Sequence, residues 1–389
     1  MGQPLEGYQD EIYLNGLGGA VPALPADLRQ LEVLAREHMR PEAFGYIYGG
    51  AGSGDTVREN ATAFRRWRIV PQMLTDVSAP SYASQVLGAA LTVPMMLGPI
   101  GVLKLAHPDG EVAVARAAAA LGVPMVLSTA ATAAMEEVAE IGGPRWYQLH
   151  WPKDRDVAAS LLSRAKAAGF SVLVVTLDTR LLGWRPHDLD AAFLPFLRGM
   201  GVQNYFSDPA FTAGLDSSPA DDQDAAVLRW ASMFGDPSLT WDDLPFLREH
   251  WDRPVVLKGI CAVADAQRAV DAGMDGIVVS NHGGRQVDGG IGALDALRPI
   301  VTAVGSRTTV LFDSGVRGGA DIIKAVALGA KAVLIGRPYA YALGLAGEDG
   351  VRHVLRALRS DFEITMRLSG FASLADLSPA VLSRRPSLP

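Results

Sequence analysis

The sequence has 389 residues, of which 49% are hydrophobic and 20% charged, which is enough apolar material for a large globular core. The formal net charge is −7. Proteins that bind nucleic acid or anionic membranes are usually basic, so we expect neither partner. Cys261 is the only cysteine, no intrachain disulfide can form, and no basic and apolar leader opens the sequence. We therefore expect a soluble cytoplasmic protein.

Residues 1–90 precede any repeated pattern, and we predict an N-terminal extension that is helical around 25–47 and 55–66. It contains the run GGAGSGDT at 49–56, which looks like a phosphate-binding loop. The run has no lysine and follows no apolar strand. We therefore predict no nucleotide binding there.

Eight short apolar runs follow the extension, each ending in a small or polar residue. They are unbroken rather than alternating, which is typical of parallel strands buried on both faces. In chain order they lie at 93–101, 124–129, 145–150, 171–178, 253–259, 275–281, 308–315 and 331–337.

Alanine-rich segments of helical length separate most of these runs, most clearly at 109–122, 153–169, 262–273 and 319–329. Eight alternations of strand and helix predict an α/β fold, the (β/α)₈ or TIM barrel. A doubly wound sheet is the alternative, but no GxGxxG opens a helix after the first strand. We expect a single domain over 1–389. Its predicted parts are the extension, the barrel at 91–182 and 251–340, the insertion at 183–250, and a C-terminal helical segment and tail at 341–389.

The segment 183–250 interrupts the alternation after the fourth strand. It is rich in Pro, Gly, Asp and Ser, and it holds Trp184, Trp230 and Trp241. A long insertion at the carboxyl end of a barrel strand is typically an active-site lid or a subunit contact. The alternative is a tolerated surface loop.

Polar residues stand at the predicted strand ends, where barrels of this kind carry their function. If the barrel prediction holds, they converge on one mouth. They are Pro99, Gly101, Ser128, Thr129, Gln148, His150, Thr176, Asp178, Lys258, Ser280, His282, Asp313, Gly336 and Arg337.

Lys258 closes an apolar strand in a chain with few lysines. Buried beside a delocalised anion, it would supply a compact positive charge, although a lysine that only reaches toward solvent is the alternative. The segments after strands seven and eight, DSGVRGGAD and IGRP, combine glycines with Arg317 and Arg337. That combination favours a phosphate site over turns that merely need glycine.

His282 and Arg285 stand together in SNHGGRQ, directly after a strand. Asp178 ends another strand and can reach a histidine at the same mouth, where the pair would form a general base. Arg285 offers a fork for a substrate carboxylate. No second His or Cys stands at ligand spacing, so we predict no metal site.

Over nearly its whole length the sequence resembles the FMN-dependent L-2-hydroxy acid oxidases and dehydrogenases. Within that family, GWRPHDL at 183–189 and NYFSDPAF at 204–211 are most similar to lactate 2-monooxygenase. The other segments that carry the resemblance are YIYGGAG at 46–52 with Asn60, AHPDGE at 106–111, TLDT at 176–179, LKGI at 257–260, SNHGGRQ at 280–286 and DSGVRGGADIIKAVALG at 313–329.

The resemblance implies FMN as cofactor and a 2-hydroxy acid as substrate. It implies that His282 takes the hydroxyl proton while the Cα hydrogen leaves as hydride for flavin N5, with a carbanion route as the older alternative. Asp178 would orient His282, Arg185 and Arg285 would bind the substrate carboxylate, and Tyr46 would hydrogen-bond the substrate.

The resemblance also implies the residues that hold FMN, and an assembly of four or eight chains. Lys258 would stabilise the reduced flavin. The isoalloxazine would be held by Pro99, Ile100, Gly101, Ser128, Gln148, Thr176 and Ser280. The ribityl phosphate would be held by Asp313, Gly315, Arg317, Gly336 and Arg337.

In the monooxygenase, dioxygen reoxidises the flavin while the keto acid stays bound and is then decarboxylated, and Gly101 would leave room over the flavin. The family usually has tyrosine where this sequence has His150, a residue that titrates near neutrality. A bulkier or scaffold-bound 2-hydroxy acid, oxidised with release of the keto acid, is therefore the alternative. A barrel that has lost catalysis and only binds or assembles is a third reading, which the intact His282, Asp178 and Lys258 disfavour.

Overall fold

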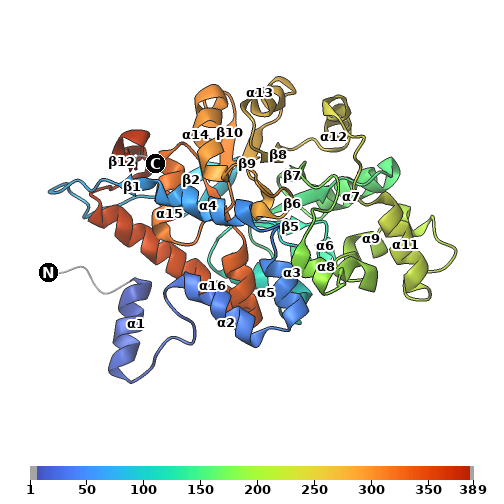
Figure 1. Ribbon diagram of the computed structural model, residues 1–389, viewed down its shortest axis with the longest axis horizontal. Helices are drawn as coiled ribbons and strands as arrows, with labels where there is room; N and C mark the ends of the chain where they lie inside the picture. The colour runs from blue at the N-terminus through green and yellow to red at the C-terminus, as the bar shows by residue number, and fades with distance from the viewer. Residues whose placement is uncertain (1–6, 386–389) are drawn as a thin grey trace.

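A closed barrel of eight parallel strands forms the centre of the computed structural model, which describes residues 7–385 (Figure 1). Around the barrel the order is β10-β11-β4-β5-β6-β7-β8-β9, so neighbours in the chain are neighbours in space. The strands are β4 (Met95–Leu97), β5 (Met125–Ser128), β6 (Arg145–His150), β7 (Leu173–Thr176), β8 (Val255–Ile260), β9 (Gly276–Val279), β10 (Thr309–Phe312) and β11 (Val333–Ile335). The predicted (β/α)₈ barrel is confirmed.

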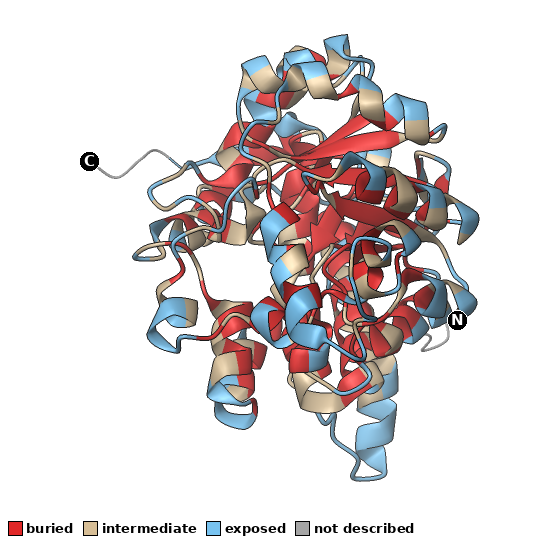
Figure 2. Ribbon diagram, turned by 90° about the vertical axis from the view of Figure 1, so that its right-hand side faces the viewer, coloured by how far each residue is buried: buried red, intermediate tan, exposed pale blue. Residues whose placement is uncertain are grey.

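Most residues of these strands are apolar, in keeping with strands whose two faces are both buried, as Figure 2 shows for the central ribbons. Along β6, Trp146 belongs to one core cluster, while Tyr147 and Leu149 belong to a second. The first cluster contains residues from each barrel strand and from the hairpin of β2 (Ser84–Val86) and β3 (Ala89–Leu91). The second cluster packs against the helices.

Helices follow the strands as predicted. Those of the barrel are α5 (Gly110–Ala120), α6 (Met135–Glu140), α7 (Arg155–Ala167), α13 (Val263–Asp271), α14 (Ala293–Val304), α15 (Gly319–Ala327) and α16 (Arg337–Leu368). The last helix begins at Arg337, directly after Gly336, rather than at the predicted boundary of 341. Strand eight therefore ends at Ile335, and Arg337 lies in the first turn of a helix.

The stretch predicted to be helical around 25–47 is helical in separate pieces. A 3₁₀ turn at Leu28–Gln30 and α2 (Leu31–His38) are separated from α3 (Pro41–Tyr48) by Met39, whose backbone is extended. The break follows from Pro41, which cannot continue a helix but suits its first turn. Helix α4 (Asp55–Arg65) lies where expected, and α1 (Tyr8–Leu17), which was not predicted, precedes them.

The end of the N-terminal extension's helical part pairs with the C-terminal segment. Strand β1 (Trp67–Ile69) pairs antiparallel with β12 (Leu382–Arg384), and Figure 1 shows both strands beside the C-terminus. The isolated bridge from Ser81 to Ser373 adds a second link between the same regions. The extension is thereby fastened to the C-terminal segment.

The insertion after β7 is folded rather than loose, and it lies at one end of the molecule (Figure 1). Its elements are α8 (Pro186–Asp190), a 3₁₀ turn at Pro195–Arg198, α9 (Gln203–Phe206), α10 (Pro209–Thr212), α11 (Gln223–Met233), a 3₁₀ turn at Trp241–Asp243 and α12 (Pro245–His250). In α10 and α11 the helix starts are capped by Asp208 and Asp222, whose carboxylates accept backbone N–H groups. Within residues 7–385, no helix combines the length and apolarity that a bilayer crossing requires.

Candidate active site

A cavity opens at the carboxyl ends of the barrel strands. It contains about 1260 Å³ of empty space, counting the part that is open to solvent. Its walls come from the strand ends, from the extension and from the insertion. Among the residues predicted for the site, those lining it are Tyr46, Pro99, Ile100, Gly101, Ser128, Gln148, His150, Thr176, Arg185, Lys258, His282, Arg285, Asp313, Gly315, Arg317, Gly336 and Arg337.

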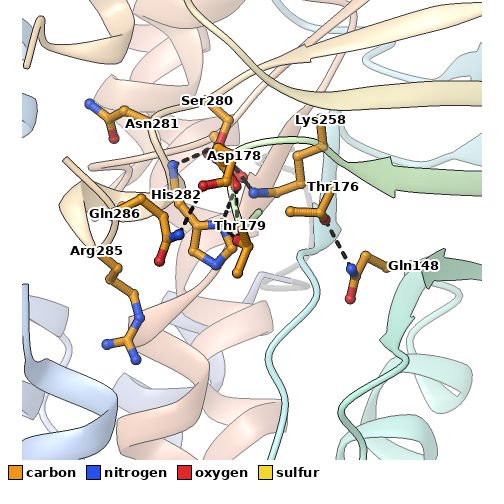
Figure 3. A network of polar contacts seen from close by, with 12 residues as sticks. Gln148, Thr176, Asp178, Thr179, Lys258, Ser280, Asn281, His282, Arg285 and Gln286 are labelled. Atoms are coloured by element: carbon orange, nitrogen blue, oxygen red, sulfur yellow. Dashed lines mark hydrogen bonds and ion pairs between the residues drawn. The ribbon is translucent and has the colours of Figure 1, made fainter. Parts of the chain in front are cut away.

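His282 and Asp178 form a hydrogen-bonded pair at the cavity (Figure 3). Nδ1 of His282 lies 2.7 Å from Oδ1 of Asp178, and the hydroxyl of Thr179 donates to the same oxygen at 3.1 Å. Burial alone would raise the pKa of Asp178, but the charge and hydrogen bond of His282 lower it to about 2. Burial lowers the pKa of His282 despite that carboxylate. Near neutral pH the pair is therefore a neutral imidazole beside a carboxylate.

The tight turn after β9 presents His282 to the cavity. Its backbone has φ of 56°, and Asn281 accepts a hydrogen bond from the N–H of Gly284, which closes the turn. Asn281 in turn exchanges two side-chain hydrogen bonds with Asn60 of α4, at 2.9 and 2.7 Å. Asn60 of the extension thus anchors the turn that carries His282.

Lys258 is buried at the end of β8. Its Nζ lies 3.1 Å from Oδ2 of Asp313 and 3.1 Å from Oγ of Ser280. Burial opposes its charge, but the carboxylates of Asp313 and Asp178 prevail and raise its pKa. A permanent positive charge therefore stands in the cavity wall.

Arg285 and Arg337 share acceptors at the end of α3. Each donates to the carbonyls of Ile47 and Gly49, at 2.7 to 3.2 Å, and Arg337 also donates to the carbonyl of Gly283 at 2.9 Å. In the described part of the chain, neither has a carboxylate within ion-pair distance. Burial lowers the pKa of Arg337 to about 10, so it remains a cation near neutral pH. Two cations without counter-ions in one cavity favour an anionic ligand.

Arg185 reaches the cavity from the start of the insertion. Its side chain is only 7% exposed, and Oδ2 of Asp188 lies 3.9 Å from its Nη1. Burial, and then the nearby charge of Arg285, lower its pKa to about 10. Arg185 and Arg285 therefore bring two positive charges to the same cavity.

Aromatic side chains of the insertion make one wall of the cavity. Phe196 and Phe234 line it, with ring centroids 5.9 Å apart, and Trp230 stacks on both from behind. His150 faces Phe234 at 6.0 Å. Burial, and then the nearby His282, lower the pKa of His150 to about 3, so this imidazole is neutral.

Two glycine-containing segments have a structural reason for their composition. A Cβ on Gly101 would stand 2.7 Å from Cβ of Ala130, so the close approach of these two loops requires glycine. In the glycine run 49–56, backbone N–H groups of Ser53 and Thr56 donate to the carboxylate of Asp288, and a Cβ on Gly52 would stand 2.6 Å from the same carboxylate.

Of the remaining predicted site residues, Asp178 and Ser280 lie behind His282 and Lys258 rather than in the cavity wall. Sequence reasoning missed several residues that do line it. These are Ile47, Ala130, Thr179, Leu182, Phe196, Phe234 and Ser314. For Thr179 the motif TLDT was a usable signal, whereas the insertion residues carried none.

The residues present fit an anionic aromatic cofactor. Glycine backbone at Gly98, Gly101 and Gly336 lines the cavity together with Lys258, and a Cβ on Gly336 would meet nothing closer than 4.0 Å. Arg337 supplies charge that no carboxylate of the described chain neutralises. A barrel mouth with this combination suits a phosphorylated aromatic cofactor of the flavin nucleotide kind.

Comparison with known proteins agrees. A family model described as FMN-dependent dehydrogenase matches residues 35–384. An FMN-dependent alpha-hydroxy acid dehydrogenase of Schizosaccharomyces pombe is 47% identical over 96% of this chain and 95% of its own. An L-lactate oxidase of a Nostoc species is 43% identical over 92% and 98%. Mandelate oxidase with (S)-4-hydroxymandelic acid superposes with a TM-score of 0.83 at 38% identity, over 94% of this chain and all of that one.

The chain belongs to the FMN-dependent dehydrogenase family, and its cofactor is FMN.

Proposed function

We propose that this protein oxidises an L-2-hydroxy acid to the 2-keto acid. The pairing of His282 with Asp178 beside a cation-lined cavity is the observation that carries the proposal. The relatives described above, a hydroxy acid dehydrogenase, a lactate oxidase and a mandelate oxidase, support it. When bound, FMN supplies a two-electron acceptor for the hydrogen on the substrate's Cα, and dioxygen can reoxidise it.

His282 takes the proton of the substrate hydroxyl. Its Nδ1 is held by Asp178, and its Nε2 has no hydrogen-bond partner among the described residues. Nε2 is therefore the nitrogen that accepts the proton. Asp178 stays ionised and stabilises the imidazolium that forms, which lowers the barrier to proton removal.

The substrate carboxylate binds to Arg185 and Arg285. Arg285 stands over the ring of Tyr46 at 5.3 Å, and its guanidinium is held by the carbonyls of Ile47 and Gly49. The hydroxyl of Tyr46 hydrogen-bonds the substrate. Burial raises the pKa of Tyr46, so this hydroxyl remains a hydrogen-bond donor at neutral pH.

Two groups of residues would hold the cofactor. Pro99, Ile100, Gly101, Ser128, Gln148 and Thr176 would hold its ring system, and Ser280 would act there through its hydrogen bond with Lys258. Asp313, Gly315, Arg317, Gly336 and Arg337 would hold its phosphate. The charge of Lys258, which Asp313 keeps in the protonated state, would compensate negative charge on the reduced ring.

We further propose that the keto acid is decarboxylated in place, as in lactate 2-monooxygenase. Pyruvate and hydrogen peroxide held together would give acetate, carbon dioxide and water. The insertion supplies Arg185, Phe196 and Phe234 to the cavity, so it is the element that would retain the keto acid.

Release of the keto acid from a bulkier substrate is the second candidate. The neutral His150 and the aromatic wall of Phe196 and Phe234 favour a substrate with a larger apolar side chain than lactate. The likeness to mandelate oxidase favours the same reading.

One experiment tests the proposal and separates the two candidates. The FMN-loaded protein is mixed anaerobically with L-lactate or with L-mandelate while the visible flavin absorbance is recorded. Bleaching by either acid is expected, and a flavin that stays oxidised with both and with other 2-hydroxy acids would contradict the function. After air is admitted, acetate from lactate indicates decarboxylation in place, whereas keto acid with peroxide indicates release.

A further inference from the structure

The side chain of Gln286 joins the turn that carries His282 to the segment after β7. Figure 3 shows Gln286 beside Asp178 and His282. Its Nε2 donates to the carbonyl of Asp178 at 2.8 Å and to the carbonyl of Leu181 at 2.9 Å. Its Oε1 accepts from Nη2 of Arg185 at 2.5 Å. One amide therefore connects the catalytic carboxylate's loop, the first residues of the insertion and the turn that carries His282.

These segments touch directly, without side chains between them. A Cβ on Gly183 would stand 2.5 Å from the carbonyl oxygen of Arg285 and 2.9 Å from Cα of Gln286. Arg185 also donates from Nε to the carbonyl of Arg285 at 3.1 Å. The start of the insertion is thus held against residues 285–286 by both packing and hydrogen bonds.

These contacts fix the orientation of the guanidinium of Arg185. Because a guanidinium is planar and rigid, fixing Nε and Nη2 fixes the direction of the remaining nitrogen. In the described part of the chain Nη1 makes no hydrogen bond, and Asp188 is 3.9 Å away. Nη1 is therefore the nitrogen left for a ligand in the cavity.

We infer that Gln286 is a positioning residue for substrate recognition. It sets the plane of Arg185 for the substrate carboxylate, and it fastens the entry of the insertion to the turn of His282. It is not itself in the cavity wall. The inference rests on the proposed function, because it assigns the substrate carboxylate to Arg185.

The amide chemistry explains why glutamine suits this position. It combines one acceptor for Arg185 with two donors for the two carbonyls, and no other side chain of this length does so. Gln286→Met keeps the length and volume but removes the hydrogen bonds. Gln286→Asn keeps the amide but shortens its reach by one methylene. The two variants differ in shape, so the test does not depend on one of them folding.

The first measurement compares binding and turnover in the FMN-loaded enzyme. We expect both variants to retain FMN, to bind oxalate at least about tenfold more weakly by flavin spectral shift, and to show a matching rise in KM. The limiting rate of anaerobic flavin reduction should change less than KM. Val287→Ala, at an exposed neighbouring residue, is the control and should behave as the native enzyme.

The second measurement asks whether Gln286 acts through Arg185. In Arg185→Met, adding Gln286→Met should cause little further loss, because the two residues serve one interaction. In Gln286→Met, kcat/KM for a 2-hydroxy acid should fall relative to the native enzyme, and kcat/KM for the neutral methyl ester of that acid should fall much less. Additive losses, or equal losses for acid and ester, would overturn the inference. A native enzyme that no 2-hydroxy acid reduces would instead overturn the proposed function.

Discussion

The imidazole rings of His150 and His282 face one another in the cavity, with centroids 6.4 Å apart and planes 30° from parallel. Only His282 has a carboxylate at its Nδ1, whereas Nδ1 of His150 is buried without a partner in the described structure. The two rings therefore differ in function despite their similar chemistry. His282 can take up a proton, whereas burial, and then the nearby His282, lower the pKa of His150 and keep it neutral.

Replacing His150 tests its part in substrate choice. His150→Tyr adds a phenolic hydroxyl and removes the imidazole from the wall beside Phe234. We expect the ratio of kcat/KM for L-lactate to that for L-mandelate to rise by about 10-fold or more, since pocket polar groups set specificity. His150→Phe, which has no polar atom, separates size from hydrogen bonding. An unchanged ratio in both variants would show that this position does not select the substrate.

The pH dependence follows from the state of His282. The base must be neutral to accept a proton, and burial lowers its pKa below the usual 6.5. We therefore expect kcat/KM for anaerobic flavin reduction to be level at neutral and higher pH and to fall at acidic pH, about tenfold per unit below the pKa.

The same profile in Asp178→Asn provides the comparison. Without the carboxylate the imidazolium is less stable, so the acidic limb should move to lower pH and the level rate should drop by about tenfold or more. A limb that moves to higher pH would contradict the assigned pair. Asp156→Asn, at an exposed residue outside the cavity lining, serves as a control for the loss of a carboxylate.

Loss of the positive charge of Lys258 should weaken FMN retention, slow flavin reduction and lower the stability of the protein. Lys258→Met leaves Asp313 without its ion-pair partner and removes the positive charge from the cavity wall. We expect slower flavin reduction, weaker FMN retention after dialysis, and a loss of unfolding free energy of about 3 kcal/mol. Lys331→Met, at an exposed residue, should change none of the three. Native FMN retention and native reduction in Lys258→Met would exclude the proposed role.

Gly259 makes room for the catalytic carboxylate. Its φ is +105°, and a Cβ there would stand 2.8 Å from Oδ2 and Cγ of Asp178. Gly259→Ala should therefore lower the free energy of unfolding by about 1–3 kcal/mol. It should also lower the rate of flavin reduction.

Gly273→Ala provides the matched control. It also has positive φ, +73°, but an added Cβ would meet nothing within 4 Å. It should lose stability through backbone strain alone and keep the native rate of flavin reduction. Equal effects of the two substitutions on the rate would show that contact with Asp178 is not the cause.

The sequence predicted the structure best where a local structural requirement restricts the residue type. Unbroken apolar runs identify parallel strands, because both faces are covered, and the polar residue after each run then lies at the barrel mouth. Ser280, His282 and Lys258 could be found in this way. Pro41 also indicates the break between α2 and α3, because proline suits the first turn of a helix but not its interior. The prediction of a helical stretch around 25–47 did not include this break.

Contacts between distant segments left no such pattern. The insertion brings Phe196 and Phe234 to the cavity through its own tertiary packing, and no periodicity in 183–250 indicates which apolar residues face inward. The Asn60–Asn281 pair joins residues 221 positions apart. In the sequence, Gln286 stands out only as the last residue of the SNHGGRQ motif. Its partners, the carbonyl of Leu181 and the guanidinium of Arg185, belong to another loop, and no sequence pattern links them to Gln286.

The pairing of β1 with β12 has a consequence for synthesis of the chain. All eight barrel strands precede residue 336, so the ribosome releases them before residues 382–384 exist. Strand β1 therefore has no partner until residues 382–384 have been made. The pairing that fastens the extension with Tyr46 and Asn60 to the C-terminal segment thus forms only after all the barrel strands are available, so this wall of the cavity is completed after the barrel.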